Sequence, residues 1–162
     1  MDKFPIYMHF LMSAIATGGF AVFINCPRLD VIISSVIGGL GWVAYRSLYL
    51  TTGEVIFPYF FATMVIGALA SIVSNRNRKP TIIYIIPGII PLVPGYNMYY
   101  TMLYLVTQKY DLALKNFLDS IFIAFAIASG LLFTESLRKI VNTALEKGFK
   151  GKINVKDEDT IS

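Results

Sequence analysis

The chain has 162 residues, 56% of them hydrophobic and only 15% charged, with a formal net charge of +4. Soluble domains average about 45–50% apolar and about 25% charged residues, so this composition excludes an ordinary soluble domain. The single cysteine, Cys26, excludes an internal disulfide, and together with one distant histidine it makes no metal site.

Apolar residues gather in separate blocks divided by charged residues. A hydrocarbon core of about 30 Å needs about 20 helical residues, and each block is long enough to cross it. We therefore expect an all-α integral membrane protein. Its membrane domain, residues 1–136, should contain about five transmembrane helices, at residues 4–24, 31–50, 55–73, 80–107 and 117–136.

The first block contains Ala14-Ile15-Ala16, which is similar to a signal-peptide cleavage site. The residues before it carry little positive charge, and the hydrophobicity continues to Ile24. We therefore expect this block to be retained as a spanning helix.

The placement of Lys and Arg predicts the orientation of the chain. With five crossings, most basic residues fall on one side, including Arg28, Arg76, Lys79 and the basic tail at residues 137–162. Basic loops favour the cytoplasm, so we expect the N-terminus outside and the tail in the cytoplasm. We expect the membrane to be a bacterial-type plasma (inner) membrane. The tail is too short for a domain and should be a helix end followed by a mobile terminus. If residues 80–107 re-entered instead of spanning, this charge bias would almost vanish.

The fourth block is the most informative, because its apolar sequence is interrupted by Pro87-Gly88-Ile89-Ile90-Pro91-Leu92-Val93-Pro94-Gly95. Each proline removes a backbone donor and presses its ring on the preceding turn. Irregular backbone at membrane depth persists only where it is buried in protein or lines a wet cavity, and transporters often bind substrate at such interrupted helices. We expect a Pro/Gly-rich hinge at residues 87–95, near the bilayer midplane.

The half-helix after this hinge is predicted to begin with Asn97 as its N-cap. Its exposed amides and the positive end of its dipole favour a carboxylate or another anion. Tyr96, Tyr100 and Tyr104 share one face, with Tyr99 beside them, so they either line a pathway or pack and form an interfacial belt. The candidate substrate-binding residues are Pro87, Gly88, Pro91, Pro94, Gly95, Tyr96, Asn97, Tyr99 and Tyr100.

Two titratable residues inside the blocks are candidates for proton coupling. Asp119 lies in the last block, where a carboxylate is costly unless it is paired or hydrated, and His9 lies in the first. A histidine, or a carboxylate whose pKa burial raises, can carry a proton in a transport cycle. The alternative is that Asp119 is an interfacial anchor and that His9 has no coupling role.

The pattern Pro-Gly-x-x-Pro-Leu-x-Pro-Gly within Ile85–Gly95 resembles the signature of the threonine/serine exporter family. Further similarity, over roughly residues 5–135, is carried by Phe20–Arg28, Gly38–Trp42, Ala68–Ser71 and Arg76–Pro80. The resemblance implies a short, second-half membrane subunit that exports small hydroxy amino acids or dicarboxylates such as succinate. It also implies a larger partner subunit that carries the first half and a soluble domain.

Other function classes have weaker support in the sequence. No paired-carboxylate, His-cluster or Ser/His/Asp constellation at usable spacing predicts an enzyme or a cofactor site, and membrane orientation explains the positive charge without nucleic acid. We predict a subunit of a secondary transporter that exports small carboxylates. The alternative is an accessory or scaffold membrane subunit in which the hinge only shapes a helix.

Overall fold

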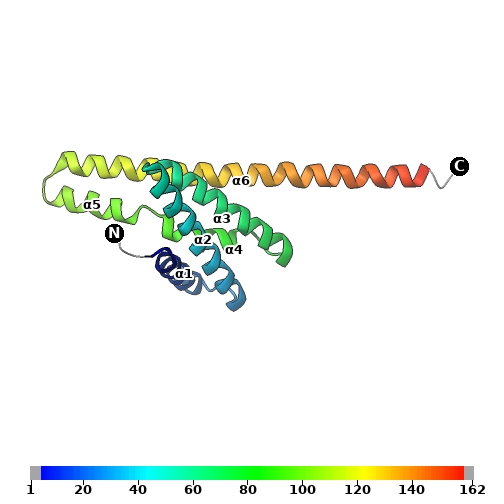
Figure 1. Ribbon diagram of the computed structural model, residues 1–162, viewed down its shortest axis with the longest axis horizontal. Coiled ribbons are helices and arrows are strands. Elements are labelled where there is room, and N and C mark those ends of the chain that lie inside the picture. The colour runs from blue at the N-terminus through cyan, green and yellow to red at the C-terminus, as the bar shows by residue number, and fades with distance from the viewer. Residues whose placement is uncertain (1–4, 159–162) are drawn as a thin grey trace.

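The structure, a computed structural model, describes the backbone of residues 5–158 and the side chains of residues 5–141 and 143. Within residues 5–158 every regular element is a helix (Figure 1). The elements are α1 (Ile6–Phe23), α2 (Arg28–Thr52), α3 (Ile56–Asn77), α4 (Ile82–Ile89), the 3-10 helix η1 (Ile90–Leu92), α5 (Gly95–Val106) and α6 (Tyr110–Glu158).

Four helices in the described part of the chain are long and apolar enough to cross a membrane: α1, α2, α3 and residues Tyr110–Val141 of α6. Taken together, the segment Ile82–Leu92 and α5 are also long and apolar enough to cross a membrane, but they are bent by 49° where they meet. This bent pair corresponds to the predicted fourth helix and makes a fifth crossing if it acts as one span. The prediction of an all-α membrane protein is confirmed.

Helix boundaries differ from the predicted ones mainly at the ends. α2 begins at Arg28, directly after Pro27, whose extended backbone (φ −55°, ψ 142°) lies outside the helix. α6 begins at Tyr110 and continues as one helix to Glu158, where we expected a short helix end and then a mobile terminus. Residues 137–158 contain five lysines, which are good helix formers, and no proline, which permits this continuation. Residues 159–162 lie outside the described part.

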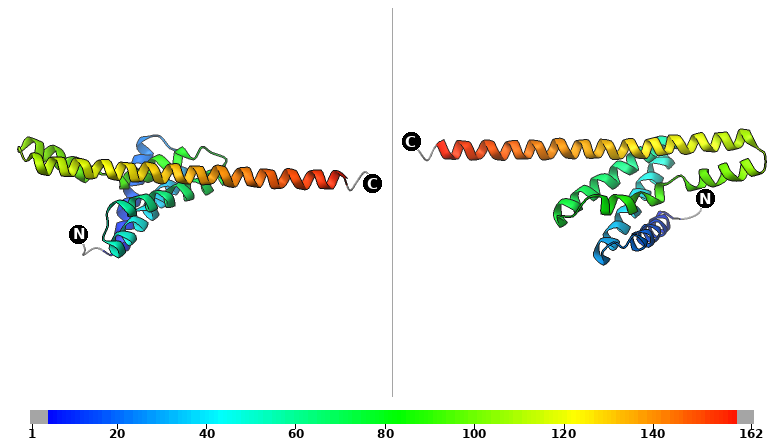
Figure 2. Two further views of the ribbon diagram at one scale, coloured as in Figure 1. Left: turned by 90° about the horizontal axis from the view of Figure 1, so that it is seen from above. Right: turned by 180° about the vertical axis from the view of Figure 1, so that it is seen from behind.

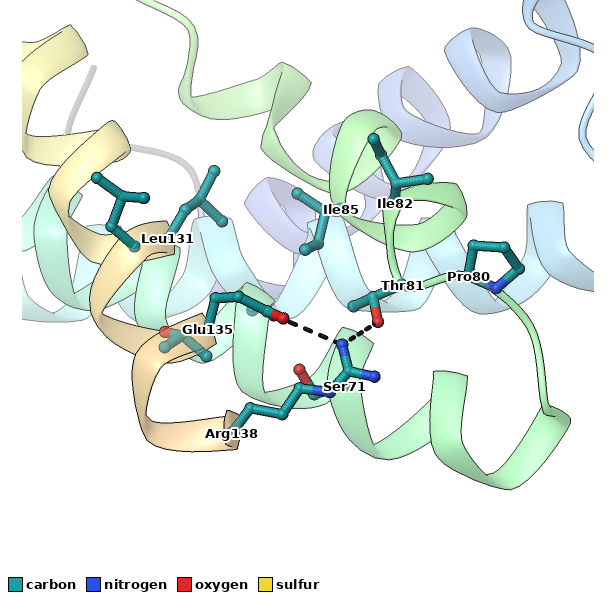
Figure 3. A pocket seen from close by; sticks show the side chains of 11 residues that line it. Ser71, Pro80, Thr81, Ile82, Ile85, Leu131, Glu135 and Arg138 are labelled. Atoms are coloured by element: carbon teal, nitrogen blue, oxygen red, sulfur yellow. Dashed lines mark hydrogen bonds and ion pairs between the residues drawn. The ribbon is translucent and has the colours of Figure 1, made fainter. Parts of the chain in front are cut away.

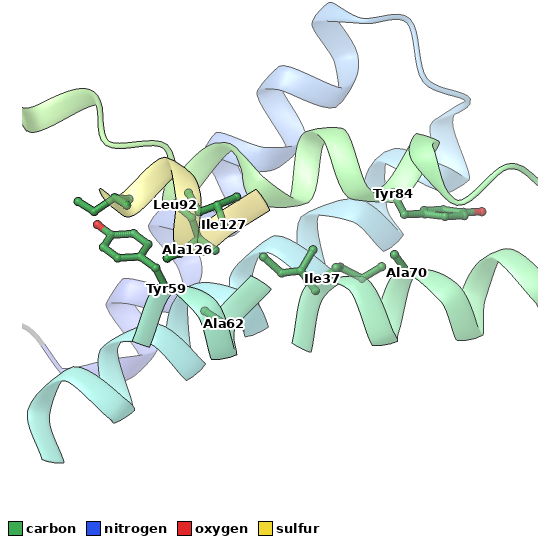
Figure 4. Close-up of a cluster of buried hydrophobic side chains, with 10 residues drawn as sticks. Ile37, Tyr59, Ala62, Ala70, Tyr84, Leu92, Ala126 and Ile127 are labelled. Carbon is green, nitrogen blue, oxygen red and sulfur yellow. The ribbon is translucent and has the colours of Figure 1, made fainter. Parts of the chain in front are cut away.

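The buried core lies where α2, α3, α4 and α6 meet. Its side chains include Ile37 of α2, Ile66 of α3, Tyr84 of α4, Leu92 of η1 and Ile127 of α6 (Figure 4). Every one of these helices contributes to a single cluster, so one face of α4 is buried, while Ile82 and Ile86 on α4 stay exposed. The irregular backbone that follows α4 is thereby held against the helical body.

Small residues allow these helices to approach closely. A Cβ atom at Gly130 of α6 would lie 2.7 Å from the carbonyl oxygen of Phe60 in α3, which leaves no room for a side chain. Gly38 of α2 likewise faces Thr17 of α1 without space for a Cβ atom. Glycine at both positions therefore permits the close helix contacts that stabilise membrane bundles.

α5 and the first part of α6 form a hairpin that projects beyond the other helices (Figures 1 and 2). α5 packs mainly on α6, while its opposite side exposes Tyr96, Met98, Tyr99, Met102 and Val106. The second half of the broken segment is therefore open on one side and is less buried than the first half.

Candidate functional site

The break in the fourth segment is narrower than the sequence predicts. The backbone stays helical through Pro87 and buried Gly88, and Pro91 lies in η1. The helical course ends after Leu92, and Val93 and Pro94 link it to α5, which begins at Gly95. Helix continues past Pro87 because one missing donor costs a single backbone hydrogen bond, whereas Pro91 and Pro94 remove two further donors within four residues.

Asn97 is not the N-cap of α5, and that expectation is wrong. The cap position belongs to Pro94, and no side chain caps this helix end. Asn97 lies in the first turn instead, where its backbone oxygen accepts a hydrogen bond from the hydroxyl of Thr101 at 2.7 Å. The amide of Gly95 donates to the backbone oxygen of Val93 at 2.7 Å, so the uncapped amides of Tyr96 and Asn97 are the ones left for another acceptor.

The tyrosines of α5 form one continuous ladder, as their spacing predicts. The ring of Tyr100 lies 4.5 Å from that of Tyr96, 5.5 Å from Tyr99 and 5.7 Å from Tyr104. Tyr96 and Tyr99 are 65% and 64% exposed, so this part of the ladder faces away from the helical body. A closed pathway on this side needs another surface opposite the ladder.

The two proton-coupling candidates lie apart from each other. Asp119 is exposed on α6, and no ion pair or hydrogen bond within the described residues involves it. His9 of α1 accepts a hydrogen bond at Nδ1 from the indole of Trp42 at 3.5 Å. The other nitrogen of His9, Nε2, is buried without a hydrogen-bond partner among the described residues. Among the described residues, neither Asp119 nor His9 forms a hydrogen bond or an ion pair with a residue of the break.

A buried polar network that the sequence did not predict lies at the opposite end of the broken segment from α5. The carboxylate of Asp30, only 1% exposed, is 2.6 Å from the Nζ of Lys79. It also accepts a hydrogen bond from the hydroxyl of Tyr84 at 2.8 Å, and that hydroxyl accepts one from Asn77 at 3.0 Å. The network joins α2 to the end of α3 and to α4, so it fixes where the broken segment begins.

Pairing explains why a buried carboxylate is tolerated here. A buried charge is costly unless a partner and further hydrogen bonds compensate it, and Asp30 has both. The hydrogen bond to Asp30 raises the pKa of Lys79, so the ammonium stays charged at neutral pH. One signal for this network was present in the sequence: Asp30 is the only acidic residue between Asp2 and Glu54.

Basic residues gather at this same end of the helices. Arg28 opens α2, Arg76 lies in the last turn of α3, and Lys79 follows it. Arg138 of α6 reaches the same place, because its Nη2 donates to Asn75 at 3.3 Å. We call this the basic end.

A cavity of about 430 Å³ lies between α3, α4 and α6 and reaches the basic end (Figure 3). Its polar side is formed by Ser71, Thr81, Glu135 and Arg138. The Nη1 of Arg138 donates to the hydroxyl of Thr81 at 2.6 Å and lies 3.5 Å from a carboxylate oxygen of Glu135. We call this the Arg138 cavity. None of its polar residues was predicted as a site residue: Glu135 lies at the end of the predicted fifth helix, and Arg138 lies at the start of the predicted tail.

Comparison with known proteins places the chain in a family. The family model described as Threonine/Serine exporter, ThrE, matches residues 9–137, from α1 through the break and into α6. A protein of Haemophilus influenzae, described as an uncharacterized protein, is 30% identical over 129 residues, which is 75% of this chain and 43% of that relative. The chain thus spans less than half the length of the curated relative it matches. No solved structure matches it. Since the family match covers most of the chain and includes the whole broken segment, this protein belongs to the threonine/serine exporter family.

Proposed function

We propose that this chain is a subunit of a secondary transporter that exports small carboxylates across a bacterial plasma membrane. The substrates are threonine- or serine-type amino acids or dicarboxylates such as succinate. The observation that carries the proposal is the 49° break between Leu92 and Gly95, in a chain of an exporter family. Interrupted membrane helices are a common place for transporters to bind substrate.

The chemistry at the break suits a carboxylate. The uncapped first turn of α5 offers backbone amides at the positive end of a helix dipole, which together attract negative charge. Tyr96, Tyr99 and Tyr100 add hydroxyl groups beside it. The proposed substrate-binding residues are those predicted from the sequence: Pro87, Gly88, Pro91, Pro94, Gly95, Tyr96, Asn97, Tyr99 and Tyr100.

A larger partner subunit would complete this site. The tyrosine ladder faces outward and needs an opposite surface, and the chain covers only 43% of its relative in Haemophilus influenzae. We propose that a first-half subunit with a soluble domain supplies that surface against α5. Two halves of five crossings each would be inverted relative to one another, which is a common transporter plan.

The proposed orientation puts the basic end in the cytoplasm, with the N-terminus outside and α6 ending inside. Arg28, Arg76, Lys79 and Arg138 meet at that end, and basic residues favour the cytoplasmic side. Asp119 and His9 remain the candidates for proton coupling. Neither forms an ion pair in the described part of the chain.

The test is the double substitution Pro91→Ala with Gly95→Ala in the chain co-expressed with its larger partner. Alanine at residue 91 restores a backbone donor in η1, and alanine at residue 95 stiffens the start of α5, where a Cβ atom meets nothing within 4 Å. Both changes make the break more rigid while Pro94 stays in place. Efflux of threonine, serine and succinate should therefore stop although the two subunits still co-purify.

Pro5→Ala with Gly19→Ala is the matched control, since Gly19 also has open space around it and both residues lie away from the break. The control should export normally. Normal efflux by the Pro91/Gly95 variant would mean that the break only shapes a helix, as in an accessory or scaffold subunit.

A further inference from the structure

The first half of the broken segment is closed off in this structure. Pro87 is fully buried, and Gly88 is buried as well. A Cβ atom at Gly88 would lie 3.0 Å from Ile66 of α3 and 3.5 Å from Ile37 of α2, so α4 packs closely on both helices. A substrate therefore reaches this part of the break only if α4 moves away from a neighbouring helix.

We propose that Asp30, Lys79 and Tyr84 form a latch that holds α4 against α2 and opens during transport to expose the first half of the broken segment. This inference rests on the proposed function, since it concerns access to the same break. Lys79 precedes α4 and Tyr84 lies in its first turn, and both bind the carboxylate of Asp30, at 2.6 Å and 2.8 Å. Release of this one carboxylate therefore frees the start of α4 from α2.

The charges of the latch suit a contact that opens and closes. A buried ion pair adds little stability over an apolar contact, because desolvation of the two charges opposes their attraction. The side chain of Asp30 is 1% exposed, whereas that of Lys79 is 39% exposed, so the ammonium group is already partly hydrated. Water that enters beside Lys79 solvates both charges as they separate, which lowers the cost of opening.

The surface beneath the latch is also unsuited to permanent burial. Asp30, Ser34 and Ile37 share one face of α2, and α4 lies on this face at both ends, where Tyr84 bonds Asp30 and Gly88 meets Ile37. Ser34 therefore lies beneath α4. It is 0% exposed, and its hydroxyl is buried without a hydrogen-bond partner among the described residues. Such a hydroxyl is unfavourable, and opening lets water satisfy it.

Other contacts indicate which helices stay together when the latch opens. Thr81, just before α4, donates to Ser74 of α3 at 2.9 Å and accepts from Arg138 of α6 at 2.6 Å. Arg138 also donates to Asn75 of α3 at 3.3 Å. These contacts do not involve α2, so α4 separates from α2 while it remains attached to α3 and α6.

Alkylation of single cysteines by N-ethylmaleimide tests whether the latch holds α4. The full chain, with its larger partner in nanodiscs, carries Cys26→Ser together with either Ser34→Cys beneath the latch or Thr63→Cys as the matched control. Thr63 is also 0% exposed, but it lies at the contact of α3 with Gly130 of α6, which the latch does not hold. Labelling of a buried thiol follows the population of the open form when opening and closing are fast.

Asp30→Asn and Lys79→Met each remove the ion pair and should speed labelling at residue 34 by about tenfold or more, the loss of one charged hydrogen bond. Labelling at residue 63 should not change. Asp30→Asn leaves no unpaired buried charge, so it serves if Lys79→Met does not fold. Lys139→Gln, at an exposed position of α6, should label as the unchanged protein does.

Cross-linking tests whether the latch must open for transport. Asp30→Cys with Lys79→Cys, joined by a short bifunctional maleimide, ties α4 to α2 and should stop efflux that the same variant shows before cross-linking. The control is Asn75→Cys with Arg138→Cys, which joins α3 to α6 at the same end of the protein. Since these two helices stay together, its cross-link should leave efflux unchanged.

Three results would overturn the inference. The first is unchanged labelling at residue 34 in both latch variants, and the second is equal acceleration at residues 34 and 63, which would mean general loosening. The third is normal efflux with α4 cross-linked to α2, which would make the network a static anchor. If the unchanged complex exports no small carboxylate, the proposed function fails, and labelling at residue 34 still reports whether the latch holds α4.

Discussion

Replacing Tyr84 by Phe tests the buried network that fixes the start of the broken segment. The substitution keeps the aromatic ring in the core and removes only the hydroxyl, which donates to Asp30 at 2.8 Å and accepts from Asn77 at 3.0 Å. Tyr84 is fully buried, and Asp30 is 1% exposed, so water cannot replace the lost donor without opening the core. A hydrogen bond to a charged group contributes about 1.5–3 kcal/mol, and we expect Tyr84→Phe to lower the free energy of unfolding by that amount.

Reversible unfolding in mixed detergent micelles measures this loss, and a double-mutant cycle assigns it. Tyr84→Phe in an Asp30→Asn background should cost less than it does alone, with a coupling of about 1 kcal/mol or more, because the charged acceptor is already gone. Tyr7→Phe, at a tyrosine that is 70% exposed, is the matched control and should change stability by less than about 0.5 kcal/mol. An effect of Tyr84→Phe no larger than that of Tyr7→Phe would refute the role assigned to the hydroxyl.

Further predictions concern packing, pH and orientation. Gly130→Ala should destabilise the protein by about 1–3 kcal/mol, since its Cβ atom would lie 2.7 Å from a backbone oxygen of α3. Gly19→Ala is the control: its Cβ atom meets open space, so the substitution should leave stability unchanged. Destabilisation by Gly19→Ala would contradict this packing argument. The raised pKa of Lys79 means that its pairing with Asp30 stabilises the fold below the unfolded pKa of about 10.4 and is lost as the pH rises through the folded pKa. Thermal melts across alkaline pH should show this loss in the unchanged protein and not in Asp30→Asn. A cysteine at Ser162, with the native cysteine removed, should be shielded from impermeant thiol reagents in intact cells, and its labelling would reverse the proposed orientation.

Composition and block length were sufficient to predict the helical membrane fold. The break was predictable as well, because three prolines so close together in an apolar segment are incompatible with one continuous helix. Its exact position was not, since Pro87 is accommodated inside α4 by packing that only the folded chain provides. Asn97 failed as a cap for a related reason: the chain re-enters helix at Gly95, as soon as the last proline is passed.

The polar sites were harder to predict than the helices. Asp30 stands in the first turn of a helix, where an acidic residue is ordinarily solvent-exposed and favoured by the dipole, and nothing local reports that it is buried. Arg138 and Glu135 line a cavity only because α6 continues along α3, so that Arg138 reaches Thr81 at the start of α4. Contacts between residues so far apart in sequence depend on helix packing, and neither spacing nor composition encodes them locally.

Efflux from intact cells is the decisive measurement for the assignment of this chain as an exporter subunit. Cells that express this chain with its larger partner, loaded with labelled threonine, serine or succinate, should export at least one of these substrates. Omitting either chain should stop that export. If omitting this chain leaves the efflux of every small carboxylate tested unchanged, the assignment is contradicted.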